Sequence, residues 1–522
     1  MESIGNIILS QILITPLVGA LVIALLPDRR KLSAGVALTF ALLTFIFTLH
    51  LPAYFNSALP GFQFVQNVPW IISPNIHYHV GVDGLSLWLV VLTGLLAPIG
   101  VLASWNTIKE RSKLFYSLFL IQQTAMLGVF VSLDLMLYYG FWELSLVPMA
   151  ILIAMYGRNQ TENGGPKAAT RFFLYTFIPS APLLVAILWL YAKTATFDFL
   201  GLQSAIATGT LPANALCWAA LAFLVAFAVK VPVLGLHGWL PDTFSEAPVA
   251  MAMIVAGKLG LYSLIRFHVG LFPVQAHQSA RWLIALAAIG VLYGALLALV
   301  QKDFWKLLAY GTLSSLSFCV LGIYGFTLSG LDGAVYQTIN EGIIGAALFV
   351  LLGVLYDRFN TSQIPQYGGL AQRTPSLVTF FVITGLALIG LPILNGFVGE
   401  FLVLSCTFTG VSRFWSTIAT VGVIFSAAYL LTLVQRIFYG PKVQPASAAP
   451  ALDLTGRERL ILWPLALLMF VMGIAPNIWL SGIETGIRSI IQPVPATKFI
   501  DIMQNPGSAA SAPRTFAQGG QR

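Results

Sequence analysis

Long runs of apolar residues constrain this chain more than any other feature. Fourteen runs are long enough to cross the roughly 30 Å hydrocarbon core of a bilayer. Only 9% of the 522 residues are charged, against about 25% in a soluble globular protein. The sequence therefore predicts an all-α polytopic membrane protein. The fourteen expected spans are 6–26, 32–53, 82–105, 113–132, 134–156, 170–192, 214–236, 247–268, 282–301, 305–326, 331–356, 375–405, 414–439 and 459–481.

Lysine and arginine residues are concentrated in the loops that follow odd-numbered spans. The loops after even-numbered spans hold only Lys193, Arg266, Arg281 and Arg413. Because positively charged loops stay on the cytoplasmic side, the pattern predicts a bacterial inner-membrane protein with both termini on the periplasmic side. The loop 54–80 has no lysine or arginine, as expected of an outside loop.

Two proline-containing segments indicate an internal repeat. Residues 229–235 (VKVPVLG) in the seventh span and 390–396 (GLPILNG) in the twelfth place proline inside an apolar run. Proline removes a backbone hydrogen bond and opens the helix. The segments lie five spans apart, and an odd offset inverts the topology. We therefore expect two inverted five-helix repeats, helices 4–8 and 9–13, containing broken helices. Span 375–405 is long enough to be one of these.

These features divide the chain into five parts. Residues 1–112 hold the first three helices, 113–268 the first repeat, and 269–440 the second, inverted repeat. Residues 441–500 comprise a linker and the fourteenth helix. Residues 501–522 are rich in small and polar residues, which predicts a disordered tail.

Five ionisable side chains fall inside otherwise apolar spans: Glu143, Lys230, Lys258, Glu341 and Glu400. By insertion scales, each charge at the bilayer centre costs roughly 2.5–3.5 kcal/mol. Such residues therefore face the bundle interior and pair with one another. Chains of acids and bases inside a membrane are typical of proton pathways. The set predicts a proton relay, and we use that name for these five residues.

Glu143 in the fifth span and Lys230 in the seventh are expected to pair. Desolvation favours the neutral form of a buried lysine, and a nearby carboxylate favours its charged form. A pair that opens and closes would move Lys230 between its two protonation states. The alternative is a static ion pair that holds two helices together, although desolvation leaves such a pair little net stabilisation.

Lys258 is expected to be the next carrier, and Glu341 and Glu400 to complete the relay in the second repeat. The alternative for Lys258 is snorkelling to the interface, against which its depth argues. Asp83 either caps the third helix or contributes to function. Asp242 either belongs to a cytoplasmic inlet or caps a helix.

The sequence holds no pattern for a redox group or a metal. Cys217, Cys319 and Cys406 are isolated, and there is no Cys-x-x-Cys, Gly-x-Gly-x-x-Gly or phosphate loop. The net charge of +8 is spread in small groups between apolar runs, so nucleic-acid binding is not expected.

Six strings resemble the antiporter-like subunits of respiratory complex I, specifically the chain M type, the counterpart of mitochondrial subunit 4. They are spread over most of the chain, and the string GVDGLSL favours this type over the N-type subunit. The strings are GVDGLSLWLVVLTGLLAPIG (81–100), FWELSLVPMAILIAMYG (141–157), FAVKVPVLGLHGWLPD (227–242), LVQKDFWKLLAYGTLSSLSF (299–318), GLDGAVYQTINEGIIGAALFVLLGVLYDR (330–358) and NGFVGEFLVL (395–404).

The resemblance implies a proton-translocating subunit of a complex I-type NADH:quinone oxidoreductase, coupled to quinone reduction elsewhere. FMN, iron–sulfur clusters and quinone would then belong to other subunits, and this chain would carry no cofactor. Its partners would be L-type and N-type antiporter-like subunits and the lipid bilayer. Glu143, Lys230, Lys258 and Glu400 match the family's glutamates and lysines on the fifth, seventh, eighth and twelfth helices.

The chain departs from the family pattern at two positions. Glu341 and Ser315 stand where the family usually has histidine, so the central relay would be free of histidine. Two alternatives remain open at this point: a subunit of a multi-subunit Na+/H+ antiporter, and a subunit of a membrane-bound hydrogenase-type complex. Both kinds of protein share the glutamate and lysine motifs, and only the chain M-type strings separate them.

Overall fold

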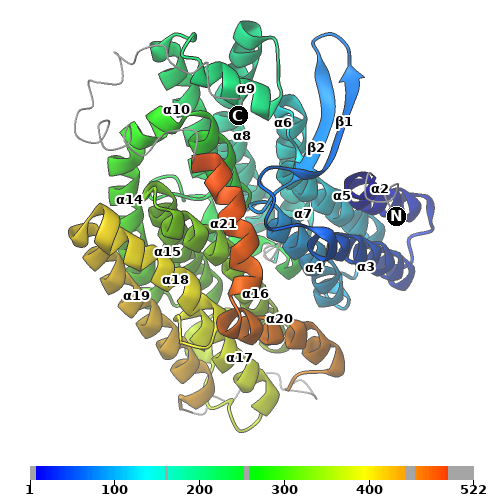
Figure 1. Cartoon of the computed structure of the whole chain (residues 1–522). Helices are drawn as coiled ribbons and strands as arrows, with labels where there is room; N and C mark the ends of the chain where they lie inside the picture. The colour runs from blue at the N-terminus through cyan, green and yellow to red at the C-terminus, as the bar shows by residue number, and fades with distance from the viewer. Residues whose placement is uncertain (1–6, 159–162, 252–257, 442–452, 492–522) are drawn as a thin grey trace.

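The computed structural model describes residues 7–158, 163–251, 258–441 and 453–491, which form a helical bundle with one β-hairpin (Figure 1). The expected tail, 501–522, lies outside the described residues, as does most of the expected linker. The N-terminal part of the bundle contains α2 (Ile8–Leu25), α3 (Arg30–Tyr54), α4 (Leu87–Ser104), α5 (Ser112–Val131), α6 (Leu135–Leu144), α7 (Leu146–Tyr156), α8 (Gly164–Thr194), α9 (Phe199–Ala207), α10 (Ala213–Lys230), α11 (Leu240–Glu246), α13 (Lys258–Ser263) and the π-helical η2 (Leu264–Val269).

The remaining described helices form the C-terminal part of the bundle. They are α14 (Pro273–Val300), α15 (Phe304–Tyr324), α16 (Leu328–Phe359), η3 (Ile364–Gln366), α17 (Pro375–Leu388), α18 (Asn395–Cys406), η4 (Thr407–Val411), α19 (Arg413–Val434), η5 (Gln435–Tyr439), α20 (Gly456–Ile474) and α21 (Asn477–Ile491).

The described helices confirm a polytopic membrane bundle. Eleven are long and apolar enough to cross a membrane, and α20 with α21, bent by 71°, makes a twelfth if the pair is one span. Span 375–405 is interrupted, as its length predicted, by a turn between α17 and α18. The expected span 247–268 is partly outside the described residues, and its remainder is α13 and η2.

Helix breaks occur at both predicted proline–glycine segments. Helix α10 ends at Lys230 and α11 begins only at Leu240, and Gly235 between them has a φ of 91°. In the second segment, Gly390 has a φ of 75° in the turn before α18. Residues with side chains rarely adopt such angles, so glycine suits both turns.

Residues 54–80, which were expected to form an outside loop, contain secondary structure that was not predicted. Strands β1 (Gln63–Ile71) and β2 (Ile76–Val82) form an antiparallel hairpin, so the chain is not purely α-helical. The Leu133 N–H donates to the His79 carbonyl oxygen at 2.8 Å, which fixes β2 to the end of α5. Valine, isoleucine and aromatic residues favour strands, and these residue types are frequent in this stretch.

The last described helix, α21, lies across the bundle on the side of the hairpin (Figure 1). It packs against α16 and against the residues that precede α4. A β-carbon at Gly84 would overlap the carbonyl oxygen of Gly482, and one at Gly486 would lie 2.7 Å from the Leu85 nitrogen. Glycines thus let the backbone of α21 contact the backbone of the chain just before α4.

Candidate functional site

Lys230 is the last residue of α10, and its side chain is only 4% exposed. The carboxyl end of a helix carries a partial negative charge, which favours a cation there. The Lys230 Nζ donates to Ser145 Oγ at 3.3 Å and lies 4.9 Å from the centre of the Trp142 ring. The helix break therefore holds a buried ammonium between a hydroxyl and an aromatic face.

The expected direct pair between Glu143 and Lys230 is absent among the described ion pairs. The lysine contacts Ser145 instead, and Glu143 acts on it only electrostatically, from a greater distance. The Oε1 atom of Glu143 is buried and has no hydrogen-bond partner among the described residues. Sequence reasoning missed Ser145, which marks a break in the fifth span between α6 and α7.

Lys258 connects the first half of the site to the second. Its side chain is 2% exposed, and its Cε would lie 2.7 Å from a β-carbon added at Gly342. The lysine therefore runs along α16, beside Glu341, where glycine leaves the necessary room. The opposite side of the same short helix packs on the break in the seventh span, because a β-carbon at Gly260 would lie 2.7 Å from the Val231 nitrogen.

Glu341 and Glu400 form the second part of the cluster. Glu341 is 7% exposed, its Oε1 atom has no hydrogen-bond partner among the described residues, and Ser315 lies beside it. The Glu400 carboxyl folds back onto Gly390, in the turn before α18, and the charge of Glu341 acts on it. The structure thus places Glu341 near both Lys258 and Glu400.

Two asparagines fix the break in the twelfth span. The Asn340 Nδ2 donates to the Asn395 carbonyl oxygen at 2.9 Å, and the Asn395 Nδ2 donates to Asn340 Oδ1 at 2.9 Å. Both side chains are fully buried. Because Asn395 is the first residue of α18, these bonds hold α18 against α16 one residue from Glu341.

Three further buried polar residues were missed by sequence reasoning. Tyr429 on α19 is 2% exposed and close enough to Glu341 and Glu400 for both charges to act on its hydroxyl. Gln122 and Gln123 lie in the middle of α5, and each has a buried amide atom without a partner in the described part of the chain. The sequence signal for these two residues is a pair of glutamines inside an apolar run.

Asp83 and Arg266 form a buried ion pair outside the relay. Asp83 Oδ1 accepts from the Ser86 N–H at 3.1 Å and from Arg266 Nη2 at 2.5 Å. Asp83 thus lies in the turn before α4 and is not its N-cap, because Ser86 occupies that position. Both side chains are 1% exposed. The assignment of Arg266 to an outside loop was therefore wrong, because it belongs to the π-helical η2 inside the bundle. Asp242 pairs with Arg171 at the surface.

A second ion pair, at the hairpin, predicts an acid-sensitive contact. His79 Nδ1 lies 2.7 Å from Asp198 Oδ1. Burial raises the pKa of Asp198, but hydrogen bonds from His79 and the Gly201 N–H outweigh it and hold that pKa below its ordinary value. The stabilisation is therefore complete above the unfolded-state pKa of about 4 and is lost as the pH falls through the lower folded-state value.

We expect Asp198→Asn to remove this part of the acid sensitivity. The melting temperature of the purified protein should fall less steeply between pH 5 and pH 3 in the variant than in the wild type. Asp453, whose pKa is also held down, is unchanged in both proteins, so the difference between the two curves isolates Asp198. Parallel curves would contradict the prediction.

No group of three or more histidine, cysteine, aspartate or glutamate side chains that could hold a metal occurs among the described residues. The cluster is suited to moving protons, because it combines carboxyl groups and amines that can each take up or release a proton. Lys230, Lys258 and Glu341 are buried, whereas Glu143 and Glu400 are half-buried.

Comparison with known proteins gives one consistent result. Residues 132–426 match the family described as NADH:quinone oxidoreductase/Mrp antiporter, TM, and residues 12–133 match NADH-ubiquinone oxidoreductase chain 4, amino terminus. The chain is 37% identical over 502 residues to NADH-quinone oxidoreductase subunit M of Rhodobacter capsulatus, covering 93% of this chain and 96% of that one. It is 35% identical to NADH-ubiquinone oxidoreductase chain 4 of Marchantia polymorpha, covering 93% and 97%.

Solved structures agree. A chain of respiratory complex I from Thermus thermophilus superposes with a TM-score of 0.83 at 30% identity, covering 94% of this chain and all of that one. A chain of the Mrp complex from Dietzia has the same fold, with a TM-score of 0.82 at 19% identity, covering 95% and 99%. The chain therefore belongs to the subunit M (chain 4) family, the proton-translocating, antiporter-like membrane subunits of NADH:quinone oxidoreductase.

Proposed function

We propose that protons cross this subunit through Glu143, Lys230, Lys258, Glu341 and Glu400, in that order. Lys230, when neutral, accepts a proton at Nζ from the side of Glu143 and passes it toward Lys258. Lys258 delivers it to Glu341, and Glu400 receives it for release on the opposite side. Each carrier returns to its starting protonation state, so one proton entering on one side leaves on the other.

The observation that carries this proposal is the position of Lys258. Its helix packs on the broken seventh span next to Lys230, while its side chain lies against Gly342, beside Glu341. A single flexible amine therefore bridges the two halves of the cluster. Ser315 and Glu341 take the place of the histidines usual in the family, so the transfer at this point needs a carboxyl group rather than an imidazole.

We also propose that the chain has fourteen spans, with helices 4–8 and 9–13 as inverted repeats. The same pair of backbone hydrogen bonds supports this in both halves, where the segment before α6 or α15 pairs with a segment far along the chain. Asp134 and Asp303 cap these two helices in the same way, each accepting from two backbone N–H groups. The bonds are Leu135 N to Phe197 O (2.9 Å), Phe199 N to Leu133 O (2.8 Å), Phe304 N to Ser362 O (3.0 Å) and Ile364 N to Lys302 O (2.7 Å).

The ends of the repeats support the same division, 113–268 and 269–440. The first repeat ends in the π-helical η2, which contains Arg266, and the second ends in the π-helical η5, which contains Arg436. π-Helical turns are rare, so their occurrence at equivalent places favours a common origin.

In this proposal the hairpin and both termini face the periplasm, and the subunit lies between L-type and N-type antiporter-like subunits. FMN, iron–sulfur clusters and quinone belong to other subunits of the complex. Relatives named as parts of NADH-quinone oxidoreductase support the assignment. The distribution of lysine and arginine supports the orientation.

Lys258→Gln tests the relay. In liposomes containing the whole complex, NADH-driven proton uptake is expected to fall at least about tenfold, because positioned proton carriers typically contribute more than that. Lys193→Gln is the matched control, since Lys193 is an exposed lysine outside the relay. Complex with Lys258→Gln that assembles and pumps at the wild-type rate would refute this path.

A further inference from the structure

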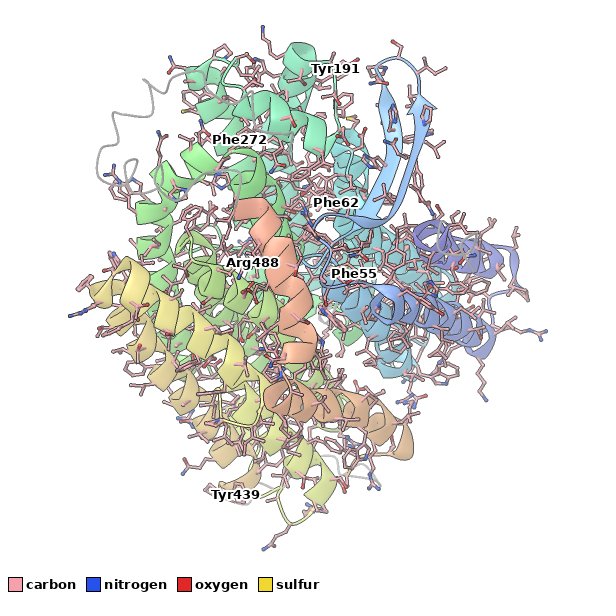
Figure 2. All side chains as sticks on the ribbon, in the orientation of Figure 1. Phe55, Phe62, Tyr191, Phe272, Tyr439 and Arg488 are labelled. Carbon is pink, nitrogen blue, oxygen red and sulfur yellow. The ribbon has the colours of Figure 1, made fainter. Side chains whose placement is uncertain are left out.

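A cavity of about 230 Å³ lies on the hairpin side of the molecule. The foot of the hairpin, α9, η2 and α21 contribute its walls, and Phe62 lies beside α21 at the foot of the hairpin (Figure 2). The lining combines aromatic rings with polar groups that the proposed relay does not use. These residues include Phe62, His79, Phe199, Gln203, Arg266 and Ser489.

Arg266 separates this cavity from the interior of the bundle. Its Nη2 donates to Asp83 Oδ1 at 2.5 Å and its Nε to the Tyr262 hydroxyl at 3.3 Å. The guanidinium carbon lies 5.0 Å from the centre of the Phe62 ring and 5.6 Å from that of Phe199. Since Arg266 is only 1% exposed, the group is enclosed by its partners even though it borders the cavity.

Two hydroxyl groups lie on the helical segment between Lys258 and Arg266, and each donates to a backbone carbonyl oxygen: Tyr262 to that of Phe130 at 3.1 Å and Ser263 to that of Leu259 at 2.7 Å. Next to Tyr262, the Ser263 hydroxyl accepts from the Tyr138 hydroxyl at 2.7 Å. Tyr138 lies one helical turn before Trp142, whose ring faces Lys230. Lys258 is at the start of the same helical segment as Arg266, about 12 Å away at the rise of an α-helix. Without a barrier at Arg266, water entering from the cavity would reach these hydroxyls and carry protons toward the lysines.

The chemistry of the guanidinium makes it such a barrier. A hydroxyl both donates and accepts, so it can pass a proton along a hydrogen-bonded chain. A guanidinium has five hydrogen-bond donors and no acceptor, and it does not lose its proton in proteins. A chain of proton transfers therefore stops at the arginine.

We propose that Asp83 and Arg266, with Phe62 and Phe199, form an outer seal that prevents protons in the cavity from returning to Lys258 and Lys230. Arg266 blocks the transfer, and Asp83 is a positioning residue that holds the guanidinium in place. The proposal rests on the relay described above, because a seal matters only if Lys258 and Lys230 carry protons.

Passive proton leak tests the seal. The double variant Asp83→Asn/Arg266→Gln replaces the pair by neutral groups of similar size and leaves no unpaired buried charge. In liposomes containing the assembled complex, without NADH and with the membrane potential clamped by potassium and valinomycin, an imposed pH gradient is expected to collapse about tenfold faster than with the wild type.

The matched control is Glu484→Gln/Arg488→Gln. These residues form an exposed ion pair on α21, on the same side of the molecule, with Nη2 and Oε1 2.5 Å apart. The complex with this control double variant should hold the pH gradient as the wild type does. An assembled Asp83→Asn/Arg266→Gln complex that also holds the gradient would overturn the proposal.

A second measurement does not depend on replacing the pair. In a Cys217→Ser background, Gln203→Cys on the cavity wall should react with a membrane-impermeant thiol reagent added to the outer side. Ser263→Cys, on the inner side of Arg266, should not react. Labelling of Ser263→Cys in a complex with Asp83 and Arg266 intact would refute the seal.

The seal and the relay can fail separately. The relay is measured as NADH-driven uptake by Lys258→Gln, whereas leak and labelling are measured without turnover. Unchanged uptake with Lys258→Gln refutes the relay, and an unchanged leak with Asp83→Asn/Arg266→Gln refutes the seal.

Discussion

Replacing Lys230 by alanine is expected to abolish proton uptake through this subunit and to reduce NADH-driven quinone reduction with it. Lys230 provides the only described amine at the break of the seventh span, where its Nζ contacts Ser145 and faces Trp142. Without it, Glu143 has no buried base to pass a proton to. Both rates should fall at least about tenfold in liposomes containing the complex, while the complex still assembles.

Lys230→Arg separates transport from structure. Arginine keeps the positive charge and the aromatic contact, but a guanidinium does not release its proton. A static role that needs only charge would be fulfilled by arginine, whereas the relay predicts that the variant assembles and does not pump. Normal pumping by Lys230→Arg would contradict the relay at this residue.

Gly396→Ala is expected to disrupt the break of the twelfth span and to displace Glu400. A β-carbon at Gly396 would overlap the carbonyl oxygen of Ala387, a backbone atom at the end of α17 that has little freedom to move. Overpacking of this kind typically costs about 1–3 kcal/mol. We expect a lower melting temperature of the complex together with a large loss of proton uptake.

Gly345→Ala provides the matched control. Gly345 lies within α16, and a β-carbon there meets nothing within 4 Å. Alanine has the higher helix propensity, so this variant should be as stable as the wild type or more stable. If Gly396→Ala melts and pumps like Gly345→Ala, the break does not have the rigid role assigned to it.

The charges within apolar runs made the burial of three proposed relay residues predictable. An unpaired charge in hydrocarbon is costly, so Lys230, Lys258 and Glu341 had to face the interior, and each is less than a tenth exposed. Both helix breaks were predicted from proline, because proline cannot complete the hydrogen bonds of a helix. These features depend only on local composition and on the membrane.

Features that depend on contacts between distant segments were not predictable in this way. Arg266 lies at the end of an apolar run, where the sequence alone does not distinguish an exposed loop from a buried π-helical turn. Its burial follows from Asp83, which is distant in sequence. The hairpin was not predicted, because its two strands are defined by their pairing with each other; Pro69 lies in β1, where an edge position tolerates it. Ser145 gave no signal, since an isolated serine in a membrane helix usually packs.

The contact between Gly84 and α21 has a consequence for how the protein is made. Gly84 is synthesised early and inserted with the first helices, whereas α21 follows the last long apolar helix that the structure describes. Until the ribosome has completed α21, the segment before α4 lacks the helix that covers it. The cavity then also lacks the wall that α21 provides through Ser489. During biogenesis the first half of the protein therefore resides in the membrane with this surface uncovered, and the final described helix covers it.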